Sequence, residues 1–471
     1  MHTSPQSNPQ QRNPQQRNPQ QRNPQQYNRR QWMRATAGAL SLAALPQPTK
    51  SFAAVAKRPQ IAAIITEFSY RSHAHVILEN FLEPYLFNGQ VTDPGMDVVS
   101  LYVDQFPEGR DMARDVAKQY GIEIFPTIAG ALKRDGANLA VDGVVSIGEH
   151  GNYPLNERGQ QMYPRKRFFD EIAAVFRESG RAVPLFNDKH LSYRWDWSAE
   201  MMQVAHELKI PFMAGSSVPL AQRRPPFEFP ANEVLTEAVS IHSGGLESYD
   251  FHALEVLQSL VESRRGGESG VSEVQLLEGE AVWQAAEEGR WSLSLATAAM
   301  NAAEGKEIGS LKEFLEPADG KQHPVHAILI RYRDGLRATV LRVGASSTRW
   351  CFACRLAGKP EPLATSFYVG PWQNRNLFKA LSHAIQTHIR TGKAPYPVER
   401  THLVTGVVAA AMDSHFEKNR LVSTPHLDVT YQPTDFLAMR EMGESWKIIT
   451  EAVPQPPGIV KGGIVKGGTL R

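Results

Sequence analysis

Strand-like and helix-like stretches alternate regularly over the first half of the folded region. The segment "IAAIITEFS" at 61–69 is an apolar run typical of a strand buried on both faces of a sheet. The same patterns predict further strands at 96–104, 122–126, 141–151, 182–189 and 211–217, and helices at 73–86, 109–121, 128–135, 165–180 and 197–209. Because the two element types alternate with short connections, the sequence predicts an α/β fold with a Rossmann-like, doubly wound parallel sheet.

The second half clusters its strands instead of alternating them with helices. Turn signals separate predicted strands at 237–244, 272–279, 326–335, 336–344, 348–358 and 364–371. A long helix at 250–264 lies among them, and two helices at 375–391 and 398–417 close the region. This order predicts an α+β domain with an open, mostly antiparallel sheet and helices on one face. We place the Rossmann-like domain at 57–216, the α+β domain at 217–450 and a flexible tail at 451–471.

Residues 1–56 have the composition of a leader. Residues 8–27 repeat Asn-Pro-Gln-Gln, which cannot form a core and predicts disorder. Arg29-Arg30 and a short apolar run at 35–45 are typical of a twin-arginine export signal, and the run is too short to span a bilayer. Residues 54–56 form an A-x-A cleavage site. We expect an exported, periplasmic mature chain without a membrane segment; the alternative is a disordered leader that contains Arg-Arg by chance.

Charge and cysteine content narrow the class of protein further. A formal charge of +2 with scattered basic residues does not indicate a nucleic-acid partner. The only cysteines, Cys351 and Cys354, lie in a predicted strand, where positions i and i+3 point to opposite faces. A single C-x-x-C also supplies only half of a four-thiolate zinc site. We therefore expect two buried free thiols.

Three segments together resemble a known family. They are "ARDVAKQYGIEIFPTIAGAL" followed by "VDGVVSIGEHGNYP", then "VPLFNDKHLSYRWDWSAEMMQVAHELKIPFMAGSS", and finally "GGLESYDFHALEVLQ". Their order and spacing, from about residue 59 to about 430, resemble the Gfo/Idh/MocA oxidoreductases. The resemblance implies a dinucleotide-binding first domain, a second domain for substrate binding and oligomerisation, an NAD or NADP cofactor, and a sugar, sugar acid or cyclitol substrate. It also implies a homo-oligomer.

The resemblance assigns roles to individual residues. Lys189 falls on the lysine of the family's E-K-P segment and His252 on the histidine of its second-domain motif, so both are predicted to be catalytic. The candidate substrate ligands are His150, Asp188, His190, Tyr193 and Asp250. His150 follows the fourth strand on the edge where such sheets bind ligands. The aromatic Tyr193 suits a sugar face, although it suits domain packing equally well.

The first strand–helix loop departs from the family's pattern. Dinucleotide binding uses G-x-G-x-x-G there, whereas residues 66–73 contain no glycine. The predicted cofactor ligands are Thr66, Ser69, Arg71, Asp104 and Glu149, with Arg71 replacing backbone amides at the phosphates and Asp104 binding the ribose. Asp104 could equally stabilise a turn or cap a helix, and Glu149 could equally cap a helix or stabilise its loop through hydrogen bonds.

The missing glycines leave a second interpretation open. The chain is then a carbohydrate-binding or regulatory protein, or a metal-assisted lyase or hydrolase, that keeps the scaffold without the dinucleotide. A metal would need ligands among the acids and histidines at 149, 150, 188, 190, 242 and 252, but no recognised ligand spacing supports such a site. We therefore predict no metal ligands.

Overall fold

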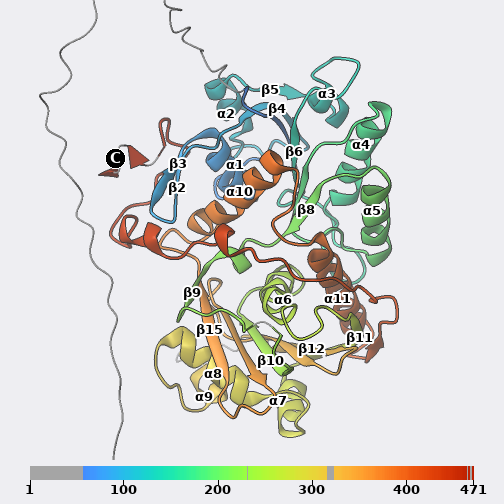
Figure 1. Cartoon of the computed structure of the whole chain (residues 1–471), viewed down its shortest axis with the longest axis vertical. Helices are drawn as coiled ribbons and strands as arrows, with labels where there is room; N and C mark the ends of the chain where they lie inside the picture. The colour runs from blue at the N-terminus through green and yellow to red at the C-terminus, as the bar shows by residue number, and fades with distance from the viewer. Residues whose placement is uncertain (1–56, 231, 316–322, 464, 467–468, 471) are drawn as a thin grey trace, which may run out of the picture. The chain divides into compact units, whose positions relative to one another are not determined.

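The first half folds around a six-stranded parallel sheet (Figure 1). Its strands, in spatial order, are β5 (Glu123–Phe125), β4 (Asp97–Val103), β1 (Gln60–Ile65), β6 (Gly143–Ile147), β7 (Leu185–Asp188) and β8 (Phe212–Gly215). In chain order within this sheet the arrangement is 3-2-1-4-5-6, the strand order of the Rossmann fold. The predicted doubly wound sheet is confirmed.

The computed structural model describes residues 57–471 except 231, 316–322, 464, 467–468 and 471. The predicted leader at 1–56 lies outside the described residues. None of the helices in the described ranges combines the length and apolar character that a membrane span requires.

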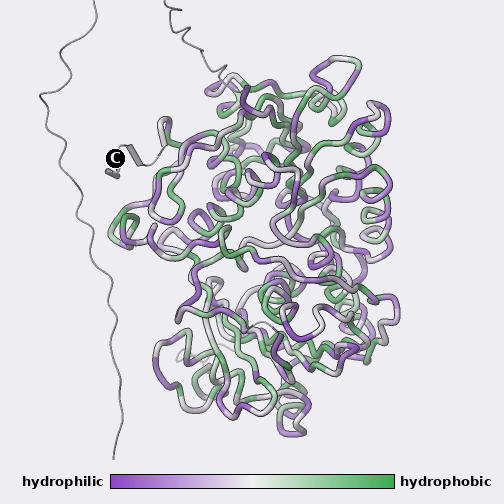
Figure 2. Tube along the Cα trace, in the orientation of Figure 1, coloured by the Kyte–Doolittle hydropathy of each residue, from purple (hydrophilic) through white to green (hydrophobic). Residues whose placement is uncertain are grey.

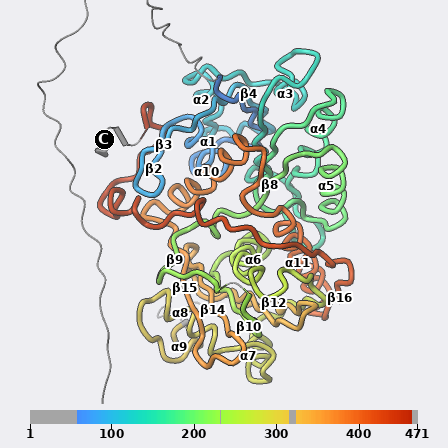
Figure 3. Tube along the Cα trace, in the orientation of Figure 1, coloured from blue at the N-terminus to red at the C-terminus, as the bar shows by residue number. Residues whose placement is uncertain are grey.

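Helices cover both faces of this sheet because its strands alternate their apolar side chains. Ile61, Ala63 and Ile65 of β1 face one core, and Ala62 and Ile64 face another. The first core is covered by α1 (His73–Leu82), α2 (Ala113–Tyr120) and α10 (Asn374–Thr391). The second is covered by α3 (Ile128–Lys133), α4 (Arg165–Glu178) and α5 (Trp195–Glu207). Figure 3 shows that α10, from late in the chain, lies beside α1.

The second half forms a separate, mostly antiparallel sheet. Its spatial order is β16 (Val422–Ser423), β11 (Val271–Glu278), β12 (His326–Tyr332), β13 (Arg337–Arg342), β10 (Leu235–His242), β14 (Trp350–Leu356), β15 (Leu363–Tyr368) and β9 (Gln222–Arg224). Only β10 and β13 pair in parallel within it. The predicted open α+β domain is confirmed.

Helices cover both faces of the second sheet, so the expectation of helices on one face was wrong. One face packs on α6 (Ser248–Val261) and α11 (Val398–Phe416). The other packs on α7 (Glu280–Glu287), α8 (Leu293–Glu304) and α9 (Leu311–Leu315), from a region where no helix was expected. In Figure 2 hydrophobic stretches gather inside the molecule, whereas hydrophilic ones follow many outer turns.

The two cysteines lie on opposite faces of β14, as their spacing predicts. Cys351 packs in the core under α8, and Cys354 packs in the core shared with α6 and α11. Both are buried free thiols, and burial raises the pKa of each to about 12. The thiols therefore behave as small hydrophobic side chains.

The C-terminal segment is held against α10 and against Glu83, which follows α1. The Arg375 guanidinium donates to the backbone oxygens of Pro456 and Gly458, and Gly462 donates its N–H to Glu83 at 2.6 Å. These contacts involve the described part of the predicted tail. The remaining elements are short: the hairpin of β2 (Tyr85–Phe87) and β3 (Gln90–Thr92), the pair β17 (Val465–Lys466) and β18 (Thr469–Leu470), and the 3-10 turns η1 (Val218–Leu220), η2 (Leu437–Met439) and η3 (Glu444–Lys447).

Helices α6 and α11 carry buried ionisable side chains where they meet. Glu255 on α6 accepts a hydrogen bond from Thr401 Oγ1 at 2.7 Å, and its Oε2 atom is buried without a hydrogen-bond partner among the described residues. Burial raises the pKa of Glu255 to about 7, although the nearby Arg400 opposes the shift. Glu255 is therefore neutral in the folded protein over a pH range in which an exposed glutamate is ionised.

The raised pKa of Glu255 predicts a pH-dependent stability. The folded chain retains a proton on Glu255 between about pH 4.5, the usual glutamate value, and about pH 7. The stabilising contribution is therefore present below pH 4.5 and is lost as the pH rises through 7. Between pH 5 and pH 8, the unfolding free energy of the wild type should fall by about 2 kcal/mol relative to Glu255→Gln. Urea denaturation at several pH values measures this difference.

The control is Glu287→Gln, an exposed position whose unfolding free energy should depend on pH as that of the wild type does. If the unfolding free energies of Glu255→Gln and the wild type change in parallel with pH, the raised pKa of Glu255 is contradicted.

Candidate functional site

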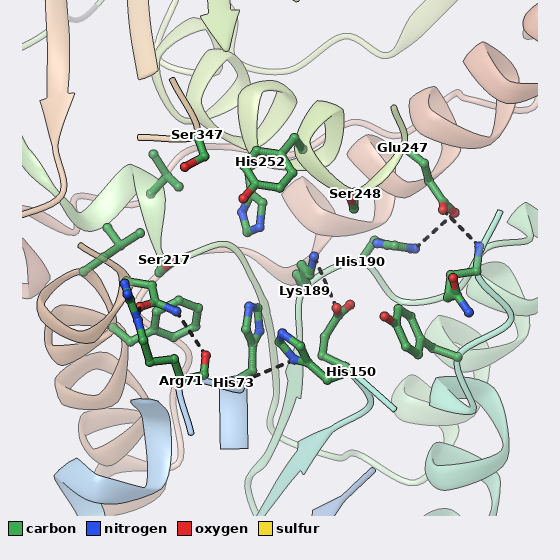
Figure 4. Close-up of a pocket in the computed structure, with 18 of the residues that line it drawn as sticks. Arg71, His73, His150, Lys189, His190, Ser217, Glu247, Ser248, His252 and Ser347 are labelled. Carbon is green, nitrogen blue, oxygen red and sulfur yellow. Dashed lines mark hydrogen bonds and ion pairs between the residues drawn. The ribbon is translucent and has the colours of Figure 1, made fainter. Parts of the chain in front are cut away.

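A cavity of about 540 Å³ lies where loops at the carboxyl ends of the parallel strands meet the start of α6 (Figure 4). Doubly wound sheets bind their ligands at this edge. The first half contributes the side chains Arg71, His73, Glu149, His150, Arg165, Lys189 and His190. The second half contributes Glu247, Ser248, Tyr249, His252 and Trp350. Lys189 and His252, the two predicted catalytic residues, therefore line one cavity.

Glu149 lies between two cations on the floor of the cavity. Its Oε2 is 3.3 Å from Lys189 Nζ, and its Oε1 is paired with the Arg165 guanidinium. All three side chains are at most 6% exposed. Burial alone would raise the pKa of Glu149, but Lys189 and Arg165 hold it well below the usual value. The carboxylate is thus charged, and it fixes the Lys189 ammonium at the cavity wall.

Arg165 also sets the protonation state of His190. Its Nη1 lies 3.0 Å from His190 Nε2, and because a guanidinium can only donate, that ring nitrogen is the acceptor. Burial, followed by the charge of Arg165, lowers the pKa of His190 well below its usual value. His190 is therefore a neutral imidazole in the cavity wall.

His73, the first residue of α1, is paired with a buried carboxylate. Its Nδ1 is 2.5 Å from Asp188 Oδ2, and the other carboxylate oxygen accepts the N–H of Lys189 at 3.0 Å. The carboxylate can only accept when ionised, so Nδ1 of His73 donates, and in the neutral form of the ring Nε2 carries the lone pair. Figure 4 shows the His73 ring pointing from the helix start toward His252. Asp188, a predicted substrate ligand, thus lies behind the wall and orients His73.

Four residues that line the cavity have strained backbones. Arg71, His150, Glu247 and Gln373 have φ values of 64°, 67°, 65° and 53°, although none is a glycine. The His73 N–H donates to His150 Nδ1 at 3.4 Å, and burial, then the neighbouring His73, lowers the pKa of His150 to about 4. Such strain is concentrated at binding and catalytic sites in proteins, and four of the described non-glycine residues with a positive φ line this one cavity.

Glu247 contributes an acid to the opposite end of the cavity. Burial raises its pKa to about 7. Its Oε2 accepts the N–H of Gln161 at 3.2 Å, and its Oε1 is buried without a hydrogen-bond partner among the described residues. Near neutral pH this carboxyl group can therefore either donate or accept a proton.

His252 lies against an aromatic wall. Its Nδ1 is 2.6 Å from Ser216 Oγ, and its ring meets Trp350 edge to face at 5.6 Å between centroids. Tyr249 stacks on Trp350 at 5.6 Å with an interplanar angle of 6°. Burial, then the charge of Lys189, lowers the pKa of His252 well below its usual value. The wall pairs aromatic surface, which suits the apolar face of a sugar ring, with a neutral imidazole.

Arg71 has no carboxylate partner among the residues that the structure describes. Its Nε and Nη2 donate to Asn374 Oδ1 and Gln373 Oε1, each at 3.0 Å. Both acceptors are neutral amides at the start of α10, so the positive charge is not compensated locally. The guanidinium at the cavity wall can therefore bind an anionic group of a ligand.

The remaining predicted cofactor ligands lie outside the cavity lining. Thr66 Oγ1 donates to the backbone oxygen of Glu149, and Ser69 Oγ donates to Glu67 at 2.5 Å. Asp104 accepts hydrogen bonds at 2.6 Å each from Tyr102, Tyr153 and Arg167. Each of these side chains thus already has partners within the protein.

Two predicted substrate ligands also lie elsewhere. Tyr193 packs its ring against Trp197 at 5.2 Å between centroids, in the packing role that its sequence context left open. Asp250 is fully buried and accepts from two histidines, and its second oxygen accepts the N–H of Glu247 at 2.8 Å. The structure does not bring either residue to the cavity.

The group of His242, Asp250 and His326 has the donor atoms of a metal site. Both histidines place Nε2 on the same oxygen of Asp250, at 2.9 and 2.7 Å. Gly244 donates its N–H to His242 Nδ1 at 3.3 Å, so the proton of that ring is on Nε2, which points at the carboxylate. A nitrogen that carries a proton cannot ligate a metal. The geometry is that of a hydrogen-bonded cluster in the core.

The residues at the usual dinucleotide position do not fit that cofactor. A Rossmann enzyme brings a glycine backbone to the pyrophosphate and a free acid to the ribose. Here Phe68 occupies the glycine-free loop and is fully buried in the core, and Asp104 is already bound by three partners. Gln105 exchanges two hydrogen bonds with the backbone of Asn152, at 3.0 and 2.8 Å, which ties the loop after β6 to the end of β4.

Sequence reasoning missed several residues of the cavity, among them His73, Arg165, Glu247, Tyr249 and Trp350. For His73 a signal existed, since it begins the helix after β1 and Asp188 ends β7, and both positions lie at the same edge of a parallel sheet. Arg165 lies in a basic cluster at 163–169, and such a cluster is more often a solvated helix face than part of a binding site. Trp350 comes from the second sheet, and no local pattern reveals that contact.

Comparisons with known proteins give distant structural likenesses only. No known protein family and no curated protein matches the sequence. Among solved structures, GenD2 from gentamicin A biosynthesis, in complex with NAD, shares 11% identity over 78% of this chain and 96% of its own, with a TM-score of 0.49. A probable dehydrogenase from Thermotoga maritima shares 10% identity over 78% and 99%, with a TM-score of 0.46. Scyllo-inositol dehydrogenase from Lactobacillus casei, with NAD(H) and scyllo-inositol, shares 11% over 78% and 99%, with a TM-score of 0.45. Likenesses this remote carry no functional argument, and the fold rests on the strand order itself.

Proposed function

We propose that this chain is an acid–base enzyme acting on a small polyhydroxylated acid, such as a sugar acid, without a dinucleotide in the Rossmann position. The observation that carries the proposal is the His73–Asp188 pair at the wall of a cavity that also holds Lys189 and Arg71. A histidine oriented by a buried carboxylate is a suitable general base, and a lysine suits a developing oxyanion.

The proposed reaction begins with binding of the ligand's carboxylate. Arg71, whose charge has no local acid partner, binds this group, while Tyr249 and Trp350 contact the ring or chain. His73 Nε2 then accepts a proton from the carbon next to the carboxylate, and Asp188 stabilises the resulting imidazolium. The electron pair moves into the carboxylate, where the cations stabilise the added charge.

Lys189 and His252 complete the proposed chemistry. Lys189 is fixed by Glu149 at 3.3 Å and stabilises negative charge on the ligand. His252, neutral because its pKa is far below the usual value, can hydrogen-bond a hydroxyl group. Donation of a proton to the opposite face by a second acid, for which Glu247 with its pKa of about 7 is the candidate, gives epimerisation, and His73 then releases its proton to solvent. Departure of a neighbouring hydroxyl as water, with the proton that His73 has taken up, gives dehydration; the site's chemistry serves both.

Solvent deuterium exchange tests this proposal whichever of the two products forms. The purified chain is incubated in D₂O with aldonic acids, uronic acids and cyclitols, and the C–H signals are followed by proton NMR. We expect exchange or dehydration for at least one acid and none for the uncharged cyclitols, because only acids offer a group for Arg71. Absence of any reaction across the acids would overturn the proposal.

The second candidate is a nicotinamide-dependent oxidoreductase on the same scaffold. It is favoured by the 3-2-1-4-5-6 strand order and by Lys189 and His252 lining one cavity. In that case Arg71 would bind a phosphate of NAD or NADP.

Cofactor release separates the two candidates. Because Asp104 already has three partners and the first loop has no glycine, we expect denatured protein to release no NAD(H) or NADP(H). We also expect neither dinucleotide at 1 mM (roughly the weak-binding limit) to raise the melting temperature. Chromatography of the supernatant left after denaturation measures the released dinucleotide, and thermal denaturation measures the melting temperature. Stoichiometric dinucleotide in the supernatant would establish the oxidoreductase instead.

A further inference from the structure

A second cavity, of about 500 Å³, lies near the C-terminal end of α6, whereas the first cavity lies at its start. Its walls come from β9, the end of α6 and the segment at 432–440. We propose that this cavity binds a small organic oxyanion, a carboxylate or a phosphate ester, between Arg223 and Arg440. The proposed acid–base chemistry uses none of these residues.

The two guanidiniums share a single exposed carboxylate. Glu228 accepts Arg223 Nη1 at 3.1 Å and Arg440 Nη1 at 2.6 Å. The side chains of Arg223 and Arg440 are each only 3% exposed, whereas that of Glu228 is 57% exposed. One of the two buried positive charges is therefore left without a carboxylate of its own among the described residues, and the carboxylate that the two arginines share is exposed to solvent.

Each guanidinium also has an unused donor. Nε of Arg223 and Nε of Arg440 are buried, and neither has a hydrogen-bond partner among the described residues. A buried charged donor without an acceptor is destabilising. An oxyanion in the cavity would supply acceptors for guanidinium donors and compensate the surplus charge.

Neighbouring charges strengthen the case for an anion. Burial, followed by the charge of Arg440, lowers the pKa of Arg223 to about 9, and Arg400 adds to the effect. Arg264 also lines the cavity, but it is already paired with Glu268 at 3.0 Å and Asp334 at 2.6 Å. Arg223 and Arg440 are thus the pair left for a ligand.

The rest of the wall indicates an organic ligand and not a bare ion. Phe229, Leu260 and Phe436 offer apolar surface, and the cavity volume falls in the range of small-molecule sites. Asp435, the other acid in the lining, accepts the N–H of Leu437 at 2.8 Å. An oxyanion head at the arginines with an apolar body along the phenylalanines fits this arrangement.

Calorimetry with matched probes tests the proposal. Phenyl phosphate and phenylacetate carry the same ring on different oxyanions, and inorganic phosphate has no ring; all are titrated at one ionic strength. We expect the wild type to bind one phenyl probe with a dissociation constant of about 1 mM or below, and more tightly than inorganic phosphate. The better phenyl probe identifies the ligand class as phosphate ester or carboxylate. Failure of both phenyl probes to bind would overturn the proposal.

Variants assign the binding to this cavity. Arg440→Gln should weaken binding at least about tenfold. Glu228→Gln removes the competing carboxylate from an exposed position, so the fold should be kept and affinity should rise about fivefold. Arg224→Gln, on the same strand but exposed over Tyr368, is the matched control and should bind like the wild type.

A final variant separates this site from the proposed active site. Arg71→Gln should abolish reaction in the first cavity and leave probe binding unchanged. Loss of probe binding in Arg71→Gln, or unchanged or weakened binding in Glu228→Gln, would show that the anion binds elsewhere.

Discussion

Replacing Arg400 by methionine should lower the free energy of unfolding by about 3–5 kcal/mol. Arg400 and Glu262 form a two-point ion pair between α11 and α6, with Nε–Oε2 at 2.9 Å and Nη2–Oε1 at 2.5 Å. Both side chains are at most 1% exposed. Methionine keeps much of the packing against Tyr396 and Phe436, over whose rings the guanidinium lies, but it leaves the Glu262 charge buried.

A double variant distinguishes two causes of this destabilisation: the unpaired charge of Glu262 and the lost packing of Arg400. Arg400→Met combined with Glu262→Met removes both charges, so most of the lost unfolding free energy should return. Arg181→Met, which breaks an exposed pair with Asp142, should change stability by less than the error of the measurement. Guanidinium chloride denaturation gives all of these values. Equal stability of the single and double Arg400 variants would mean that packing, not charge, dominates this junction.

The architecture was predictable because its signals are local and periodic. Ile61, Ala63 and Ile65 alternate with Ala62 and Ile64 between two cores, which is why β1 reads as an apolar run. Gly121 was expected to end a helix and ends α2, with a left-handed backbone at φ 66°. The three-residue strands β2, β3 and β9 are too short to show a period, and, unlike the equally short β5, they lie outside the strand–helix alternation that revealed β5.

The position of α10 could not be predicted from the sequence. This helix follows all strands of the second sheet except β16 in the chain, yet it packs beside α1 on the first sheet. Its start brings Gln373 and Asn374 over Arg71 and so closes one end of the cavity. Hydrophobic periodicity identifies a helix and its apolar face, but it does not say which of two sheets that face covers.

The candidate site was predictable in part. Lys189, His252, His150, His190 and Glu149 line the cavity because strand ends and the motif around α6 converge there. The sequence does not show which side chains already donate hydrogen bonds to a given carboxylate. Asp104 follows its strand as a ribose-binding acid would, yet three side chains from two other segments and its own strand fill its hydrogen-bonding capacity.

The second large effect is expected at His73. In the acid that exchanges fastest in D₂O, His73→Gln should reduce the exchange rate by about 10²–10⁴-fold, since the general base is lost. Binding of the same acid should change little, because the anion is held by Arg71. His206→Gln, an exposed histidine on α5, should retain the wild-type rate.

Asp188→Asn tests whether His73 acts through its orientation. The asparagine amide can present its NH₂ group to Nδ1, which moves the ring proton to Nε2 and removes the lone pair that faces the ligand. Exchange should therefore fall by a similar factor, about 10²–10⁴-fold, while the melting temperature and ligand affinity stay close to those of the wild type. Exchange at the wild-type rate in both His73→Gln and Asp188→Asn would assign the base to another residue, and His252 or Glu247 would be the next to replace. Since Glu247 has a pKa of about 7, a rate that follows its ionisation would identify it as that base.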